Sequence, residues 1–322
     1  MKVINERSAV LEHLTAAGET GIPLLCPNAE TPDEMAGVLL GAQQHAETRD
    51  LHTVVLGIGV TACYPDHPQL GNLTLPRASL EATAGLWLGW LQGYGDSGMF
   101  GRVEAVPFLD HGWEPAAQDR ELMEQVWFQK AMGIIMHDAS LRDFADNVRL
   151  TAAYVERAGP RVVVEACPDK VYERAEIERK NLPEDSMLSQ PDNVARFVAE
   201  TGVDLVVPNL GTEHRTVSDV PLTYRRELAQ ELCSRIGPRL ALHGTSSLGN
   251  RLQSVGRDGI CKVNFYTAMA RAASQRVKER WDATNPGTPL PIGLACGSAV
   301  HATRRDLFAE KTREMLELLS GA

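Results

Sequence analysis

The stretch GIIMHDASLRDFADNVRLTAAYVERAGPRVVVE, residues 133–165, contains an apolar run, a helical pattern and a second apolar run. The runs Gly133–His137 and Arg161–Glu165 predict strands, and the apolar spacing over Ser140–Ala158 predicts a helix between them. Neither run alternates with polar residues, and continuous apolar strands are expected where both faces of a parallel sheet are buried. The stretch therefore predicts a β–α–β unit of a parallel sheet.

The same unit recurs along the whole chain. Six further apolar runs of strand length alternate with helical patterns, which makes eight predicted strands: the others are Ile22–Pro27, Thr53–Gly57, Arg102–Leu109, Val203–Pro208, Leu240–His243 and Ile260–Phe265. Repeated alternation of strand and helix favours an α/β fold of the (β/α)8 TIM-barrel type. We predict one barrel domain over residues 1–322, with an extra C-terminal helix at about 301–319. A doubly wound open sheet is the alternative, but no Gly-x-Gly-x-x-Gly follows the first strand, which argues against dinucleotide binding.

Helix ends and two long connections complete the predicted layout. Thr31-Pro32-Asp33-Glu34 combines a cap residue, a proline at the first helical position and acidic residues in the first turn, which predicts a helix start. Gln190-Pro191-Asp192 predicts another start, and Gly202 predicts the end of that helix. The stretches Cys63–Pro76 and Pro168–Ser189 interrupt the alternation. The second is charged and would lie at the face of a barrel that carries active sites, so it is interpreted as either a lid or a solvated insertion.

Composition limits the classes of function. The 322 residues carry a net charge of −10, which argues against a nucleic-acid partner because phosphate binding needs a basic surface. The polar start Met1–Arg7 does not fit a signal peptide, and no apolar run approaches the roughly 20 residues that span a bilayer, so we expect no membrane partner. Six cysteines without CxxC spacing favour buried free thiols in a reducing compartment. We therefore expect a cytoplasmic protein.

Histidines and carboxylates follow the predicted strands at the points where the apolar runs end. In a barrel all of these positions converge on one mouth. Three histidines lie at matching places after the third, sixth and seventh strands, namely His111, His214 and His243. Three protein ligands with an open fourth position are the usual arrangement of catalytic zinc. The pattern predicts a Zn²⁺ site, although imidazole ligands also suit cobalt, nickel or iron.

The order of motifs resembles that of the class II, zinc-dependent fructose-bisphosphate and tagatose-bisphosphate aldolases. The motifs are Asp-His-Gly, Met-x-Asp-x-Ser, Glu, Gly-Thr-x-His, Leu-His-Gly-x-Ser and Lys-x-Asn-x-x-Thr, over about residues 103–267. The resemblance implies a metal-dependent aldolase in which His111, His214 and His243 hold zinc and Asp110 is the catalytic acid/base. It also implies that Asp138 and Glu165 orient the histidines or visit the metal. The implied substrate contacts are Gly244, Ser246, Asn264 and Thr267, and Asn28, Gly211, Arg215, Lys262 and Tyr266 are further candidates.

Three departures from the family pattern fall on the substrate side of the motifs. Gly244-Thr245-Ser246-Ser247 stands where the family has Gly-Gly-Ser-Gly, and glycines there let backbone N–H groups approach a phosphate. Arg215 replaces a glycine after the second histidine, and Tyr266 replaces an aspartate that contacts substrate hydroxyls. We therefore expect a divergent member in carbohydrate metabolism. Its substrate would be a non-glycolytic, modified sugar-phosphate-like ketose, cleaved or formed through a zinc-stabilised enediolate.

Other functions remain open at this point. A metal-dependent epimerase or another lyase would use a similar intermediate on the same site. A non-catalytic metal-binding paralogue is a further alternative, although it has no chemical reason to keep Asp110 and all three histidines. A Schiff base on Lys262 is not required where a metal stabilises the developing charge. From the resemblance we also expect a homo-oligomer, either a dimer or a tetramer.

Overall fold

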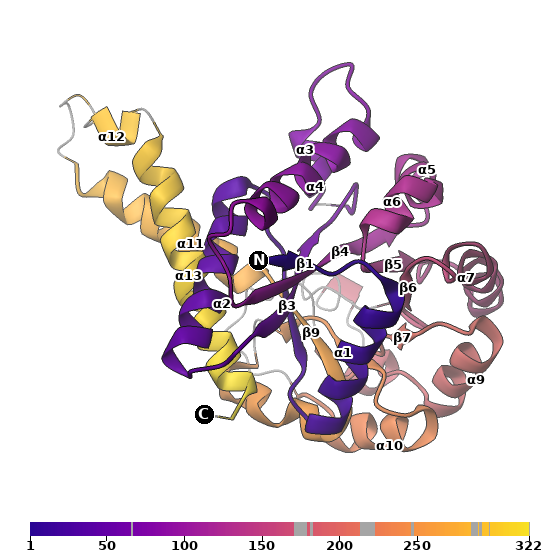
Figure 1. Cartoon of the computed structure of the whole chain (residues 1–322). Coiled ribbons are helices and arrows are strands. Elements are labelled where there is room, and N and C mark those ends of the chain that lie inside the picture. The colour runs from indigo at the N-terminus through magenta and orange to yellow at the C-terminus, as the bar shows by residue number, and fades with distance from the viewer. Residues whose placement is uncertain are drawn as a thin grey trace.

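A parallel sheet forms the centre of the molecule (Figure 1). The computed structural model describes residues 1–65, 67–170, 179–180, 183–212, 223–245, 248–284, 289, 292–295 and 297–321. Every strand pair found in these residues is parallel. The strands are β1 (Lys2–Val3), β2 (Leu24–Pro27), β3 (Val54–Val60), β4 (Val103–Trp113), β5 (Ile134–Asp138), β6 (Val163–Ala166), β7 (Leu205–Val206), β8 (Leu240–Leu242) and β9 (Ile260–Phe265).

The sheet curls so that its two ends meet. Strands β3 to β9 follow one another in spatial order, and β2 pairs with β9. A parallel bridge between Asn28 and Gly59 joins β2 to β3, where the Ala29 amide donates to the Gly59 carbonyl at 2.8 Å. The described strands β2 to β9 thus give the predicted (β/α)8 TIM-like barrel, and β1 is an addition that pairs with the beginning of β4.

Helices follow the strands and bury apolar side chains against the barrel. They are α1 (Arg7–Thr20), α2 (Pro32–Thr48), α3 (Gln69–Leu73), α4 (Leu80–Asp96), α5 (Ala117–Glu124), α6 (Val126–Ala131), α7 (Phe144–Ala158), α9 (Pro191–Thr201), α10 (Arg226–Ile236), α11 (Thr267–Asp282), α12 (Ile292–Ala295) and α13 (Ser298–Leu319), with 3-10 helices η1 (Glu184–Met187) and η3 (Gly249–Asp258). The Thr31 hydroxyl accepts from the Glu34 amide at the start of α2, and Gly202 ends α9 at φ 68°. Both boundaries are those that the sequence predicts.

The C-terminal helix α13 packs closely on α2. A Cβ atom on Gly37 or Gly41 would lie 2.4 Å or 2.3 Å from a carbonyl oxygen of α13, so glycine is needed at both positions for this approach. Arg304 of α13 pairs with the buried Glu34 at the start of α2. Helices α11 and α13 run side by side and carry α12 at their far end, away from the barrel (Figure 1).

Some boundaries differ from the predicted ones. Helix α1 was not predicted, β3 continues to Val60 rather than ending at Gly57, and β4 continues to Trp113 rather than ending at Leu109. Within the stretch 168–189, residues 171–178, 181 and 182 lie outside the described residues, so its predicted role as a lid or an insertion stays a prediction. The five cysteines in the described part of the chain are all free. In the same residues, no helix is both long and apolar enough to cross a membrane.

Candidate active site

A break in the regular geometry of β4 brings two consecutive side chains to the barrel mouth. In an ordinary strand, neighbouring residues point to opposite faces. Here the pairing register of β4 with β5 shifts between Leu109 and Gly112, and His111 has a positive φ of 51°. A Cβ atom on Gly112 would lie 2.3 Å from the Met123 sulfur, so glycine is the residue that fits beside this bulge. Asp110 and His111 therefore both reach the same site.

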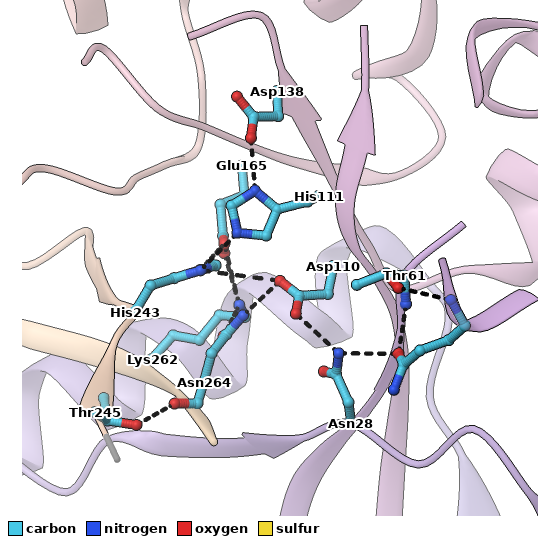
Figure 2. A network of polar contacts seen from close by, with 11 residues as sticks. Asn28, Thr61, Asp110, His111, Asp138, Glu165, His243, Thr245, Lys262 and Asn264 are labelled. Carbon is cyan, nitrogen blue, oxygen red and sulfur yellow. Dashed lines mark hydrogen bonds and ion pairs between the residues drawn. The ribbon is translucent and has the colours of Figure 1, made fainter. Parts of the chain in front are cut away.

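Two histidine rings face each other across the mouth (Figure 2). The His111 Nε2 and His243 Nδ1 atoms are 3.2 Å apart, and the two rings are nearly perpendicular. Behind each ring lies a carboxylate: Asp138 is 2.6 Å from His111 Nδ1, and Glu165 is 3.1 Å from His243 Nε2. An ionised carboxylate only accepts, so each ring donates its outer N–H to the carboxylate behind it. When the rings are neutral, both facing nitrogens then carry lone pairs directed at one point.

This donor set fits a divalent cation. Two imidazole nitrogens at 3.2 Å need either a proton or a metal cation between them, and the distance fits a metal because two nitrogens bound tetrahedrally at 2.0–2.1 Å would be about 3.4 Å apart. The carboxylates behind the rings are the usual partners of metal-binding histidines, since they fix the tautomer. Potential ligand atoms of Asp110, His111 and His243 lie within 4.8 Å of one another. His111 and His243 would thus hold the metal that the sequence predicts.

Asp110 is held by two amide side chains from neighbouring strands. Asn28, next to the end of β2, donates to Oδ2, and Asn264 on β9 donates to Oδ1, both at 2.9 Å. Burial alone would raise the pKa of Asp110, but the nearby His111, His243 and Lys262 and the Asn28 hydrogen bond bring it below its ordinary value. Asp110 is therefore an oriented, ionised carboxylate beside the two imidazoles.

Lys262 and Glu165 form a buried ion pair beneath the mouth. Both side chains are fully buried, and Lys262 Nζ lies 2.9 Å from Glu165 Oε2. Burial opposes ionisation of Glu165, but Lys262 and His243 together lower its pKa to about 2. The pair therefore stays charged, and it lies behind His243 rather than in the wall of the pocket.

The mouth opens into a pocket whose wall includes the connection after β3. The sequence indicates only that this connection interrupts the strand–helix alternation, yet Thr61, Tyr64 and His67 line the pocket. The Tyr64 ring stacks on His111 with centroids 4.4 Å apart, and the buried Gln69 accepts from Asn28 at 3.2 Å. Because β3 extends three residues further than predicted, these residues emerge directly at the face of the barrel where active sites form. The apolar run that continues through Ile58–Val60 is the signal in the sequence that could have identified them.

The structure brings most of the candidate site residues together. Asn28, Asp110, His111, His243, Gly244, Asn264, Tyr266 and Thr267 line one pocket. Asp138, Glu165 and Lys262 lie behind it, and Gly211, at φ 84°, is not among its lining residues. His214, Arg215 and Ser246 lie outside the described residues, so their predicted roles stay predictions.

Comparisons with known proteins show the family of this chain. The family model for class II fructose-bisphosphate aldolase matches residues 98–319. This chain belongs to the class II fructose-bisphosphate aldolase family. Among sequences, it is 28% identical over 186 residues to the protein YdjI of Escherichia coli K12, which covers 56% of this chain and 62% of the relative. The match therefore spans less than two thirds of that relative.

Two solved structures of similar fold align with nearly the whole of this chain. The crystal structure of the YdjI aldolase from Escherichia coli K12 has a TM-score of 0.69 at 21% identity and covers 97% of both chains. The fructose-bisphosphate aldolase of Campylobacter jejuni has a TM-score of 0.75 at 15% identity, covering 99% of this chain and 96% of its own. The TM-scores show the shared fold, and the low identities, together with the family match, describe a divergent member of the class II aldolase family.

Proposed function

We propose that this protein is a metal-dependent aldolase, which cleaves or forms the carbon–carbon bond of a ketose-type aldol. The observation that carries the proposal is the pair of facing imidazole nitrogens beside an oriented, ionised aspartate. Zn²⁺ is the metal we propose, with His214 as the third ligand beside His111 and His243. Class II aldolase membership supports the same chemistry.

Each group at the mouth has a task in retro-aldol cleavage. A divalent metal bound there supplies Lewis-acid stabilisation of the negative charge that develops on the ketose-derived fragment. Asp110 takes the proton from the hydroxyl whose carbon becomes the aldehyde, and returns it in the condensation direction. Asn28 and Asn264 occupy one position on each oxygen of Asp110, which leaves the remaining lone pairs for the substrate. Asp138 and Glu165 keep the two rings in the metal-binding tautomer.

We propose that the substrate is a modified sugar-phosphate-like ketose outside glycolysis. Tyr266 stands where the family has an aspartate, and its ring lies 4.8 Å from that of His67 in the pocket wall. Burial, with Glu34 and Glu30 nearby, raises the pKa of the Tyr266 phenol, so it stays a neutral group and offers no carboxylate to substrate hydroxyls. Thr245 adds a side chain beside Gly244, in a loop where the family carries glycine. Its hydroxyl donates to the Asn264 carbonyl.

The test is a retro-aldol screen of purified protein with measured metal content. Fructose 1,6-bisphosphate, tagatose 1,6-bisphosphate and singly phosphorylated ketoses are incubated with zinc-loaded protein, and products are identified by NMR. We expect aldehyde and ketone products from a singly phosphorylated or modified ketose. Turnover of fructose 1,6-bisphosphate at ordinary enzyme rates would reject the modified substrate. An epimerised product would favour the epimerase alternative, and stoichiometric metal without any turnover would favour a non-catalytic protein.

A further inference from the structure

Lys262 lies between two parts of the site (Figure 2). The metal half contains His111, His243 and the carboxylates behind them, and the acid/base half contains Asp110 and the amide side chains that hold it. It is on β9, it is 0% exposed, and its ammonium contacts Glu165 at 2.9 Å and 3.1 Å as well as the Asn264 side-chain oxygen. The ammonium also lies 4.5 Å from the centre of the Phe108 ring, whose face favours a cation there. Lys262 does not line the substrate pocket.

One branch leads from Lys262 to the metal half of the site. Glu165 Oε1 accepts from Lys262 Nζ and also contacts His243 Nε2 at 3.1 Å. A carboxylate held in this way keeps the proton on His243 Nε2, which leaves Nδ1 as the lone pair that faces His111. Lys262 thereby helps to set the metal-binding tautomer of His243.

The other branch leads from Lys262 to the acid/base half. The two ends of an asparagine amide are nearly equal in shape, so its orientation depends on its partners. An ammonium can only donate, and therefore the Asn264 oxygen faces Lys262. The Asn264 nitrogen is then forced toward Asp110, to which it donates at 2.9 Å. Lys262 thus ensures that Asp110 meets a donor on this side.

We propose that Lys262 is a positioning residue that couples the metal half of the site to the acid/base half. This inference rests on the proposed metal-dependent aldolase function and assigns Lys262 a role through Glu165 and Asn264, in place of the substrate contact for which it was a candidate. A single ammonium fixes the tautomer of one metal ligand and the orientation of the amide that holds the catalytic carboxylate.

Asn28 offers an internal control on the opposite side of Asp110. It donates to Asp110 Oδ2 at 2.9 Å and to Gln69 Oε1 at 3.2 Å, and Gln69 Oε1 also accepts from the Thr61 amide. A backbone N–H donor therefore fixes the Gln69 amide, which in turn fixes Asn28, without any contribution from Lys262. Both amides hold Asp110, but only Asn264 depends on Lys262.

The experiment is a pair of double-mutant cycles. Lys262→Met is combined with Asn264→Ala in one cycle and with Asn28→Ala in the other. Zinc affinity is measured by chelator competition, and kcat and KM are measured at saturating Zn²⁺ with the ketose phosphate that the wild type cleaves fastest. Lys130→Met on the surface of α6 is the matched control, because it makes the same chemical change at an exposed lysine.

We expect Lys262→Met to weaken zinc binding by about 10–100-fold and to lower kcat even when the metal site is full. Asn264→Ala should then lower kcat no more than about threefold further, because its orientation is already lost. Asn28→Ala should lower kcat by the same factor in both backgrounds, to within about twofold. Equal effects of Asn264→Ala with and without Lys262 would overturn the coupling.

A second variant separates positioning from charge balance. Lys262→Met leaves Glu165 as a buried, unpaired charge, which can prevent folding. The double variant Lys262→Met/Glu165→Gln removes that charge, and the cycles are repeated in it if the single variant does not fold. We expect the zinc affinity of the double variant to match that of Glu165→Gln alone, while its kcat at saturating Zn²⁺ stays below that of Glu165→Gln, since Asn264 remains unoriented. A kcat equal to that of Glu165→Gln alone would reduce Lys262 to a counter-charge and overturn the proposal.

The same measurements distinguish the two levels of inference. A wild-type protein that neither binds Zn²⁺ nor cleaves any ketose phosphate rejects the proposed function, and the role of Lys262 with it. A wild-type protein that does both, with additive effects in the Lys262–Asn264 cycle, rejects only the role of Lys262.

Discussion

The two histidines at the barrel mouth are supported in different ways. His111 contacts Asp138, which lies on the next strand and also accepts from the Ser140 amide, so this support is local. His243 contacts Glu165, which depends on the buried Lys262 on β9 and through it reaches Asn264 and Asp110. A change behind His111 should therefore affect metal binding alone. A change behind His243 should affect both metal binding and acid/base chemistry.

Removing either histidine ring should have the largest effect on zinc binding and activity. The effect should be the same for His111 and for His243. His243→Ala and His111→Ala each delete one of the facing nitrogens, so we expect loss of stoichiometric zinc and a fall in activity of at least about 10³-fold. Metal analysis and retro-aldol rates measure this. A variant that keeps full zinc and more than about a tenth of the activity would place the metal elsewhere.

Replacing the aspartate should separate acid/base chemistry from metal binding. Asp110→Asn keeps the shape of the side chain but removes its basic oxygen, and we expect kcat to fall by about 10²–10⁴-fold. Zinc stoichiometry should stay at the wild-type value. Loss of zinc in this variant would instead make Asp110 a metal ligand, an alternative that its 3.9 Å distance from His243 Nδ1 leaves available.

The carboxylates behind the rings test the difference between the two sides directly. Asp138→Asn and Glu165→Gln should each weaken zinc binding by about 10–100-fold. At saturating Zn²⁺, we expect kcat of Asp138→Asn to stay within about threefold of wild type, and that of Glu165→Gln to fall further because Lys262 loses its anion. Glu124→Gln, on the surface of α5, is the matched control. Equal kcat losses in the two variants would remove the distinction.

His137 lies outside the proposed metal site, and its protonation should have a small effect on the stability of the fold alone. His137 is buried, stacks on Tyr154 and contacts the Thr151 hydroxyl. Burial lowers its pKa to about 4, whereas the unfolded chain titrates near 6.5. The unfolded state therefore takes up the proton first, so stability is full above about pH 6.5 and is lost as pH falls toward 4.

Between pH 7.5 and 5.5 this loss should be about 1 kcal/mol. Denaturant titrations of the wild type and His137→Gln at the two pH values measure it. The variant should lack this part of the pH dependence. An unchanged pH dependence in the variant would show that His137 is not the group responsible.

The sequence allows prediction of the barrel and of the convergence at its mouth for a simple reason. Apolar runs without polar alternation identify buried parallel strands, and topology alone then brings the residues after those strands to one face. Asp110, His111 and His243 meet as that reasoning requires.

The remaining features depend on register and backbone conformation, which no local pattern reveals. The bulge that turns both Asp110 and His111 inward rests on a register shift and a positive φ, for which Gly112 is a local sign. The role of Lys262 follows from its burial against Glu165, 97 residues away in the chain, and from the sequence alone Lys262 is only a candidate substrate contact.

A crystal structure of zinc-loaded protein, with anomalous scattering recorded at the zinc absorption edge, is the most direct test of the central claim. We expect one zinc ion between the two rings, about 2.0–2.1 Å from His111 Nε2 and from His243 Nδ1. An empty position between these nitrogens at saturating Zn²⁺, or zinc bound only at other residues, would contradict the account.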